Sequence, residues 1–225
     1  SFETVLNHGM RAIPVTQFEL MVEETKALIL DTRNNADFSK GFIPQSINIG
    51  IDGDFAPWVG ALIADVNQPI ILVTPKGREE ETVTRLSRVG FDNLIGHLEG
   101  GFEAWKKAGH EMDTVNRISA EEFEKQVTIG ESKIIDIRKE SEYEAEHIED
   151  AYSKPLAYIN EWVKDINPEE HFFLHCAGGY RSMIAASILE ARGFRNFSEV
   201  EGGFNAIAKT KVPRTDFVCQ SKVLK

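Results

Sequence analysis

An internal repeat limits the possible folds of this chain of 225 residues more than any other feature. Three short segments return in the same order roughly 100 residues later, a period too long for a solenoid, whose units run about 20 to 50 residues. The paired segments are 28–33 with 133–138, 88–93 with 191–196, and 99–102 with 201–204. We therefore expect two similar domains, each near the common size of an independently folded unit.

The repeat also sets the expected domain boundaries. We expect the first domain at residues 10–112, the second at 116–213, and a loose C-terminal tail at 214–225. The polar segment 111–116 lies between the copies and is the expected linker. The chain opens on Ser1 instead of an initiator Met, and we interpret it as a piece of a longer chain.

Apolar runs of buried-strand length alternate with helical stretches in both copies. The expected strands include 27–31, 69–73, 133–137 and 171–175. Two S/T-x-x-E capping boxes, at 16–19 and 119–122, predict helix starts. Strands that alternate with helices favour a parallel sheet covered on both faces. The predicted fold class is α/β, with a central, mostly parallel sheet flanked by helices in each domain.

Composition excludes several classes of function. The 25 Lys and Arg against 36 Asp and Glu give a net charge of −11, which repels phosphate backbones, so we expect no nucleic-acid partner. No apolar run approaches the roughly 18 residues of a membrane span. Two cysteines make no disulfide scaffold. The N-terminus does not have the pattern of a secretory signal, and we expect a cytoplasmic location. The six histidines show no ligand spacing, so we expect no metal.

The loop at 175–182 carries the chemistry. Cys176 follows an expected parallel strand and precedes a helix that starts near Ser182, which is where α/β sheets bind ligands. Gly178 and Gly179 allow successive N–H groups to point inward as an anion nest, which Arg181 closes. Such a site favours a thiolate, and a thiolate is a nucleophile. The alternative is a small buried cysteine that only packs.

This loop, 176–182, resembles the active loop of the rhodanese family of sulfurtransferases. The pattern Asp136-x-Arg138-x5-Glu144 precedes it and 201–204 (Glu-Gly-Gly-Phe) follows, so the resemblance covers nearly the whole chain as two tandem rhodanese-like domains. It implies a sulfane sulfur donor such as thiosulfate or glutathione persulfide, a thiol or cyanide acceptor, and no cofactor. It also implies catalytic roles for Cys176 and Arg181, and a substrate-binding cradle made of Ala177, Gly178, Gly179, Tyr180 and Ser182.

Two other functions stay open. Four residues separate Cys176 from Arg181, whereas the related cysteine phosphatases have five, so sulfur transfer is favoured over arsenate reductase or phosphatase chemistry. The other alternative is a non-catalytic sulfur-carrier or regulatory module of a larger metallo-hydrolase. Tandem rhodaneses with a silent first copy resemble the C-terminal part of metallo-β-lactamase-fold fusions, some of which are persulfide dioxygenases. The metal domain would then be fused to, or a partner of, this chain.

The first copy departs from the pattern. Aligning Gly90 with Gly193 places Val73 opposite Cys176, and a slip of one residue places Thr74 there instead. Neither side chain replaces a thiolate, and Pro75 removes one N–H from the nest. We predict that the first domain is catalytically inactive.

Three other features receive structural interpretations. The Asp-x-Arg pairs at 31–33 and 136–138 occur in both copies, so we expect structural ion pairs. His175 is expected on the other face of its strand from the nucleophile. Cys219, in the tail, is expected to have no catalytic role.

Overall fold

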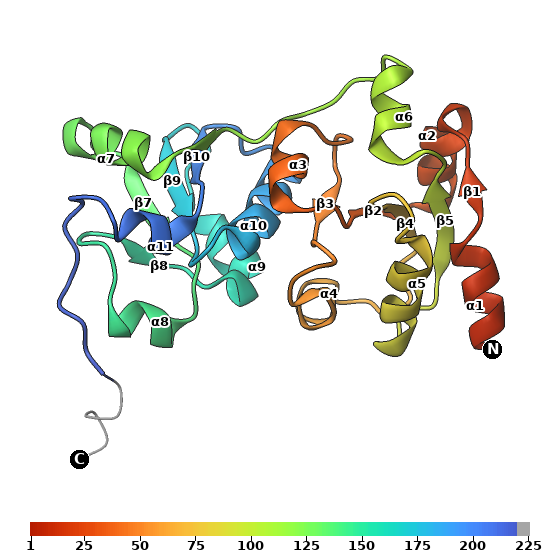
Figure 1. The fold of residues 1–225 in the computed structure, drawn as a ribbon, viewed down its shortest axis with the longest axis horizontal. Helices are drawn as coiled ribbons and strands as arrows, with labels where there is room; N and C mark the ends of the chain where they lie inside the picture. The colour runs from red at the N-terminus through yellow and green to blue at the C-terminus, as the bar shows by residue number, and fades with distance from the viewer. Residues whose placement is uncertain (220–225) are drawn as a thin grey trace. The chain divides into compact units, whose positions relative to one another are not determined.

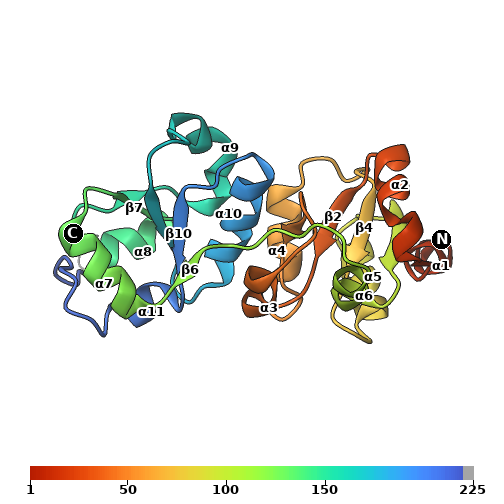
Figure 2. The same ribbon diagram turned by 90° about the horizontal axis from the view of Figure 1, so that it is seen from above.

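The computed structural model describes residues 1–219, and the chain divides into two units, Ser1–Thr114 and from Val115 onward. We call them unit 1 and unit 2. Each is built on one five-stranded sheet in which every paired strand is parallel (Figures 1 and 2). The predicted α/β class and the duplication are therefore confirmed.

Unit 1 has the strand order β1-β5-β4-β2-β3. Its strands are β1 (Ala12–Ile13), β2 (Leu28–Asp31), β3 (Ile47–Asn48), β4 (Ile70–Val73) and β5 (Leu94–Leu98). Its helices are α1 (Phe2–Gly9), α2 (Val15–Thr25), α3 (Asn35–Lys40), α4 (Phe55–Leu62), α5 (Glu79–Arg88) and α6 (Gly101–Lys107).

Unit 2 repeats this topology with the strand order β6-β10-β9-β7-β8. Its strands are β6 (Arg117–Ile118), β7 (Lys133–Asp136), β8 (Tyr152–Ser153), β9 (Phe172–His175) and β10 (Phe197–Val200). Its helices are α7 (Ala120–Ile129), α8 (Glu140–Ala145), α9 (Ile159–Trp162), α10 (Tyr180–Ala191) and α11 (Gly203–Ile207), with 3₁₀ turns at Leu156–Tyr158 and Val163–Asp165.

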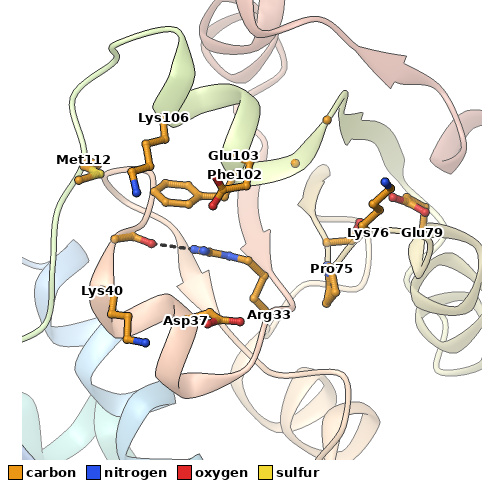
Figure 3. A pocket seen from close by; sticks show the side chains of 14 residues that line it. Arg33, Asp37, Lys40, Pro75, Lys76, Glu79, Phe102, Glu103, Lys106 and Met112 are labelled. Carbon is orange, nitrogen blue, oxygen red and sulfur yellow. Dashed lines mark hydrogen bonds between the residues drawn. The ribbon is translucent and has the colours of Figure 1, made fainter.

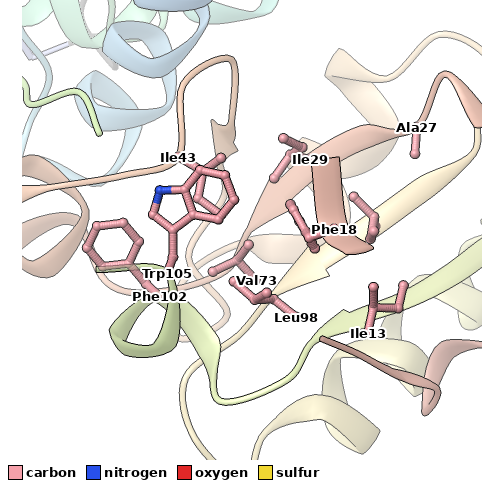
Figure 4. Close-up of a cluster of buried hydrophobic side chains, with 10 residues drawn as sticks. Ile13, Phe18, Ala27, Ile29, Ile43, Val73, Leu98, Phe102 and Trp105 are labelled. Atoms are coloured by element: carbon pink, nitrogen blue, oxygen red, sulfur yellow. The ribbon is translucent and has the colours of Figure 1, made fainter. Parts of the chain in front are cut away.

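The core of unit 1 shows why the central strands are apolar on both faces. Ile29 and Val73 face a cluster that α2 and α6 complete with Phe18 and Trp105 (Figure 4). The two aromatic rings meet edge to face, 6.0 Å between centroids, which is a favoured geometry. Helix α1 packs against α5 and β5. Because helices cover both faces of the sheet, the strand residues are apolar without alternation.

Unit 2 has a corresponding core. Phe173 of β9 meets Phe123 of α7 edge to face at 4.9 Å, and α11 packs beside α7 (Figure 2). Helix α10 packs against β9 and β10, and its residues 182–190 are all buried. Its sequence is apolar on nearly every side, which is the composition of a buried helix.

One of the two predicted capping boxes is wrong. Ser119 caps α7 as expected, because its hydroxyl accepts the N–H of Glu122 at 3.1 Å. Helix α2 instead starts at Val15 with Pro14 at the N-cap and no side-chain cap. Thr16 is therefore inside the helix, where the proline ring already fixes the entry of the chain.

Residues at both ends of the described chain pack on their own unit. Helix α1 precedes the expected domain start at residue 10 and still belongs to unit 1. Arg214 pairs with Glu146 at 2.6 Å, and the N–H of Val218 donates to the carbonyl of Ala145 at 2.8 Å. Residues 214–218 of the expected tail are thus bonded to unit 2, and 220–225 lie outside the described residues.

Within residues 1–219, no helix is long and apolar enough to cross a membrane.

Candidate active site in unit 2

Cys176 is the first residue after the central strand of the unit 2 sheet. β9 lies between β7 and β10 and ends at His175, and α10 begins at Tyr180. The thiol therefore lies at the carboxyl edge of a parallel sheet, in the turn that leads into a helix. Residues 176–181 are called the active loop below.

The Cys176 sulfur is buried and hydrogen-bonded within the active loop. The backbone N–H of Gly179 donates to Sγ at 3.1 Å, and Sγ donates to Oγ of Ser182 at 3.4 Å. The residue is 1% exposed. Gly179 has φ of 103°, a left-handed conformation that glycine adopts without strain.

The neighbouring helix fixes the orientation of the loop peptides. The N–H groups of Phe204 and Asn205 donate to the carbonyls of Cys176 and Ala177, at 2.7 and 3.0 Å. A peptide is planar with its C=O and N–H opposed, so the N–H groups of Ala177 and Gly178 point away from α11. Two successive N–H groups that point to the same side of the loop are what an anion nest needs.

Arg181 is held by a carboxylate from α8. Its guanidinium donates to both oxygens of Glu142, at 2.6 and 2.9 Å. The bond to Glu142 raises the pKa of Arg181, and the nearby Cys176 sulfur contributes in the same direction. In turn, the Arg181 hydrogen bonds lower the pKa of Glu142. This two-pronged pair positions the arginine beside the active loop.

Glu142 is a site residue that sequence reasoning missed. We expected the motif glutamate at Glu144, which is exposed; the glutamate at the site is Glu142, two positions earlier. Glu142 also accepts the backbone N–H of Lys139 and thereby caps α8. The available signal was a glutamate three residues after the N-cap residue Lys139, which is a capping position.

Glu199 of β10 is the second missed residue. It is fully buried, accepts the Ser182 hydroxyl at 2.6 Å, and accepts the Arg117 Nε–H at 2.7 Å. Burial raises the pKa of Glu199, while Arg117 and Ser182 oppose that rise. A charged residue inside an apolar strand was the available signal, because charged groups are rarely fully buried without partners.

Asp136 and Arg138 form the structural ion pair that the sequence predicted. The Arg138 guanidinium donates to both Asp136 oxygens, including 2.6 Å to Oδ2, and it lies 4.1 Å from the ring centre of Phe204. Asp31 and Arg33 repeat the pair in unit 1. Because the pair occurs in both units, it stabilises the repeated fold instead of marking the reactive one.

His175, which was expected on the other face of its strand, contacts the Cys176 backbone. It is fully buried, and its Nδ1 lies 3.0 Å from the Cys176 carbonyl oxygen. Burial lowers the pKa of His175. Its Nε2 has no hydrogen-bond partner among the described residues.

The remaining loop residues line the rim. Ala177 and Tyr180 are half-buried, and Gly178 is exposed. Ser182 is buried below the loop, between Cys176 and β10. In the described part of the chain, no group of His, Cys, Asp or Glu is placed to hold a metal ion.

Unit 1 resolves which residue replaces the cysteine. The strand registers make Val73 equivalent to His175, so Thr74 stands opposite Cys176. Aligning on the glycines that end the helices gave Val73 because α10 has two residues more than α5 while the loop before α10 is one residue shorter, a net difference of one position. Unit 1 therefore presents a hydroxyl where unit 2 presents a thiol.

In unit 1 the backbone N–H equivalent to that of Gly179 is hydrogen-bonded to a carboxylate instead of to sulfur. The N–H of Gly77, which has the left-handed conformation of Gly179, donates to Oε1 of Glu79 at 3.3 Å. Beside this loop lies a cavity of about 790 Å³ whose lining includes Lys40, Lys76 and Lys106 (Figure 3). Unit 1 thus keeps a cavity with charged side chains in its lining at the same sheet edge, and none of the lining residues is a cysteine.

Comparisons with known proteins agree with this architecture. The Rhodanese-like domain family matches residues 14–108 and 119–210. The chain is 31% identical over 140 residues to the putative sulfur carrier protein YrkF of Bacillus subtilis, covering 59% of this chain and 76% of that protein. It is 30% identical over 101 residues to the thiosulfate sulfurtransferase GlpE of Shewanella oneidensis, covering 44% of this chain and 96% of that protein.

Solved structures also match. A rhodanese-like domain protein of Staphylococcus aureus matches with 27% identity and a TM-score of 0.41, covering 44% of this chain and 96% of that one. A thiosulfate sulfurtransferase of Pseudomonas aeruginosa matches with 18% identity and a TM-score of 0.41, covering 93% of this chain and 44% of that one. With both family matches inside the two structural units, the chain belongs to the rhodanese family and carries two rhodanese-like domains in tandem.

Proposed function

We propose that this chain is a sulfurtransferase in which Cys176 carries sulfur as a persulfide. The donor is thiosulfate or a small persulfide such as glutathione persulfide, and the acceptor is a thiol or cyanide. The observation that carries the proposal is the 3.1 Å hydrogen bond from the Gly179 N–H to Sγ of Cys176. A backbone donor aimed at the sulfur stabilises a thiolate, which is the reactive form of cysteine.

The proposed loading step is a displacement at sulfur. The Cys176 thiolate attacks the sulfane sulfur of thiosulfate, the new S–S bond forms, and the donor S–S bond breaks. Sulfite leaves with the electron pair, and the persulfide keeps one negative charge on its outer sulfur. The N–H groups of Ala177 and Gly178, which the α11 contacts turn away from that helix, are available to bind this charge.

The unloading step returns the cysteine. An acceptor thiolate or cyanide attacks the outer sulfur, the Cys176 S–S bond breaks, and Cys176 leaves as a thiolate. Loop donors that stabilise a thiolate also make it a better leaving group. The same contact therefore serves both halves of the cycle.

Arg181 is proposed to orient the anionic donor. Its guanidinium is fixed by Glu142 at the rim of the loop. Held in one geometry, it attracts the sulfonate end of thiosulfate without losing side-chain freedom at the moment of binding. Tyr180, half-buried at the same rim, would contact the donor or the acceptor.

A second candidate is a sulfur carrier with slow turnover. The 1% exposure of Cys176 favours it, because a closed thiol exchanges slowly with free small molecules. In that case the chain would hold sulfur for a fused or partner metallo-hydrolase. The similarity to a putative sulfur carrier of Bacillus subtilis supports this alternative.

Arsenate reductase or phosphatase chemistry is the weakest candidate. A tetrahedral oxyanion needs loop N–H groups free to surround it, whereas the Gly179 N–H is already 3.1 Å from the Cys176 sulfur, and four residues instead of five separate Cys176 from Arg181. Hydrolysis of an aryl phosphate by the wild-type protein would support the phosphatase candidate instead.

Steady-state thiocyanate production separates the first two candidates. The assay uses thiosulfate and cyanide with wild type, Cys176→Ser and Cys219→Ser. Sulfurtransferase function predicts turnover in wild type and in Cys219→Ser, the matched cysteine control, and none in Cys176→Ser. A single stoichiometric release of thiocyanate without turnover supports the carrier.

A further inference from the structure

Four polar groups form one continuous hydrogen-bonded chain beneath the active loop. The Cys176 thiol donates to Ser182 at 3.4 Å, Ser182 donates to Glu199 at 2.6 Å, and Arg117 donates to the other Glu199 oxygen at 2.7 Å. Glu199 and Ser182 are fully buried, and Arg117 is 10% exposed. The nucleophile is therefore linked to a buried carboxylate through one hydroxyl.

Unit 1, which we predict to be inactive, lacks this chain of groups. The sheet registers place His97 of β5 opposite Ala12 of β1, where unit 2 has Glu199 opposite Arg117. The duplicated Asp-x-Arg pairs occur in both units, whereas the buried glutamate and its arginine occur only beside the cysteine. This distribution links Glu199 to the chemistry of Cys176 and not to the shared fold.

Electrostatics limit the charge that this buried chain can hold. Arg117 supplies one positive charge, so one negative charge on the other groups is neutralised. A Cys176 thiolate and a Glu199 carboxylate together would place two negative charges in the same buried network. Arg117 neutralises one of them, and Arg181, the other positive charge that interacts with Cys176, is already paired with Glu142. The other charged group that acts on Glu199 is Glu201, further along the chain, and it disfavours a second negative charge as well.

We infer that Glu199 is a positioning residue that exchanges one proton with Cys176 through the Ser182 hydroxyl. In the resting form the thiol donates to Ser182, and Ser182 donates to the Glu199 carboxylate, as the structure shows. In the reactive form every donor is reversed: protonated Glu199 donates to Ser182, and Ser182 donates to the thiolate. The burial that raises the pKa of Glu199 favours its taking up this proton.

The exchange conserves atoms and charge. The S–H bond breaks as a Ser182 O–H bond forms, and the original Ser182 O–H bond breaks as a Glu199 O–H bond forms. The net charge of the three groups stays at minus one throughout, next to Arg117. The total charge that the network buries is therefore the same in both forms, and in the reactive form the Ser182 hydroxyl has the orientation that stabilises a sulfur anion.

This role belongs to the proposed sulfur-transfer site, but it is tested by a property of the thiol alone. The experiment measures the rate of Cys176 alkylation by iodoacetamide against pH, in a Cys219→Ser background that leaves one thiol. The variants are Glu199→Gln, Ser182→Ala, Ser182→Thr and the double variant Glu199→Gln/Ser182→Ala. Glu190→Gln is the matched control, because Glu190 is a buried carboxylate at the far end of α10 that pairs with Arg195.

Glu199→Gln and Ser182→Ala should move the midpoint of the profile, which is the pH of half-maximal alkylation rate, in opposite directions. In Glu199→Gln the amide oxygen faces Arg117, which has only donors, so the amide NH₂ faces Ser182 and turns its hydroxyl to the sulfur. The midpoint should fall by about one pH unit, as expected for strongly coupled groups. In Ser182→Ala the thiolate loses its donor and the midpoint should rise, while Ser182→Thr restores the wild-type value.

The double variant identifies the route. If Ser182 carries the coupling, the shift caused by Glu199→Gln disappears in the Ser182→Ala background. An unchanged midpoint in Glu199→Gln, equal to that of Glu190→Gln, would overturn the inference. So would a Glu199→Gln shift of full size without Ser182. If Glu199→Gln does not fold, equal midpoints for Ser182→Ala and Ser182→Thr overturn the inference. Failure of sulfur transfer alone leaves these profiles measurable and refutes only the proposed function.

Discussion

Gly203 and Cys176 approach so closely that a Cβ atom on residue 203 would lie 2.4 Å from the Cys176 carbonyl oxygen. The approach lets α11 donate N–H groups to the carbonyls of Cys176 and Ala177, which turns the N–H groups of Ala177 and Gly178 away from that helix. Gly203 is also in the left-handed region, with φ of 54°. The glycine pair at 202–203 is therefore required by the geometry of the active loop, although it lies far from that loop in the sequence.

Gly203→Ala tests this relationship. We expect it to destabilise unit 2 and to displace the active loop, because the new methyl group meets backbone atoms that cannot rotate away. Gly193→Ala is the control, since Gly193 also has positive φ, 87°, but has nothing within 4 Å of the added carbon. In the control, the free energy of unfolding should fall by about 1–2 kcal/mol, because alanine is strained in the left-handed region. In Gly203→Ala it should fall by about 1–3 kcal/mol more, because the added methyl group overpacks against the loop backbone. Chemical denaturation measures both, and equal losses would contradict the close approach.

The pair between Arg181 and Glu142 should control the rate of sulfur loading. Glu142→Gln removes the charge that fixes the guanidinium, and we expect kcat/KM for thiosulfate to fall roughly 10- to 100-fold, as misplaced groups commonly cost. Glu144→Gln, two positions away on the same helix and exposed, should be unchanged. Equal activity of the two variants would show that Arg181 does not need its carboxylate partner.

Buried His175 should make the stability depend on pH. Burial lowers the pKa of His175 in the folded protein below its ordinary value of 6.5. The unfolded chain therefore binds a proton first as the pH falls, so the stability present above about pH 6.5 is lost on acidification, by up to about 1.4 kcal/mol per pH unit for one proton. His175→Asn should flatten the unfolding free energy between pH 7 and 5. His8→Gln, at an exposed position of α1, should leave the slope as in wild type, and a wild-type slope in His175→Asn would refute the assignment.

Restoring a cysteine to unit 1 should not restore its chemistry. In a Cys176→Ser background, Thr74→Cys places a thiol at the equivalent point of β4. The Gly77 N–H remains engaged by the Glu79 carboxylate, and Pro75 has no N–H, so the new thiol meets negative charge instead of donors. We expect no sulfur loading by thiosulfate, measured by mass. Stoichiometric loading on residue 74 would show that the missing thiol is the whole reason for silence.

The sequence predicted the features that repeat or that follow local rules. Apolar runs at 28–31 and 172–175 specify buried parallel strands, and the Asp-x-Arg pairs appear as ion pairs in both units. The Ser119 cap was predictable because it acts within one helical turn. Duplication made the strands and the ion pairs easier to recognise, since each occurs in both units.

Features that depend on distant contacts were not predictable in the same way. Glu142 meets Arg181 from another helix, and Glu199 meets Ser182 across the sheet edge, so neither partnership follows from spacing. Helix α2 begins at Val15, directly after Pro14, so Thr16 lies inside the helix and is not its cap. The sequence could not decide which residue of unit 1 is equivalent to Cys176. The alignment of Gly90 with Gly193 gives Val73, whereas the strand registers give Thr74.

Intact mass after exposure to a sulfur donor tests the central claim most directly. Wild type, Cys176→Ser and Cys219→Ser are each incubated with thiosulfate and, separately, with glutathione persulfide. The proposed function predicts a gain of one sulfur atom in wild type and Cys219→Ser, removal of that gain by cyanide, and no gain in Cys176→Ser. No gain in wild type with either donor, or an equal gain in Cys176→Ser, would contradict a Cys176 persulfide.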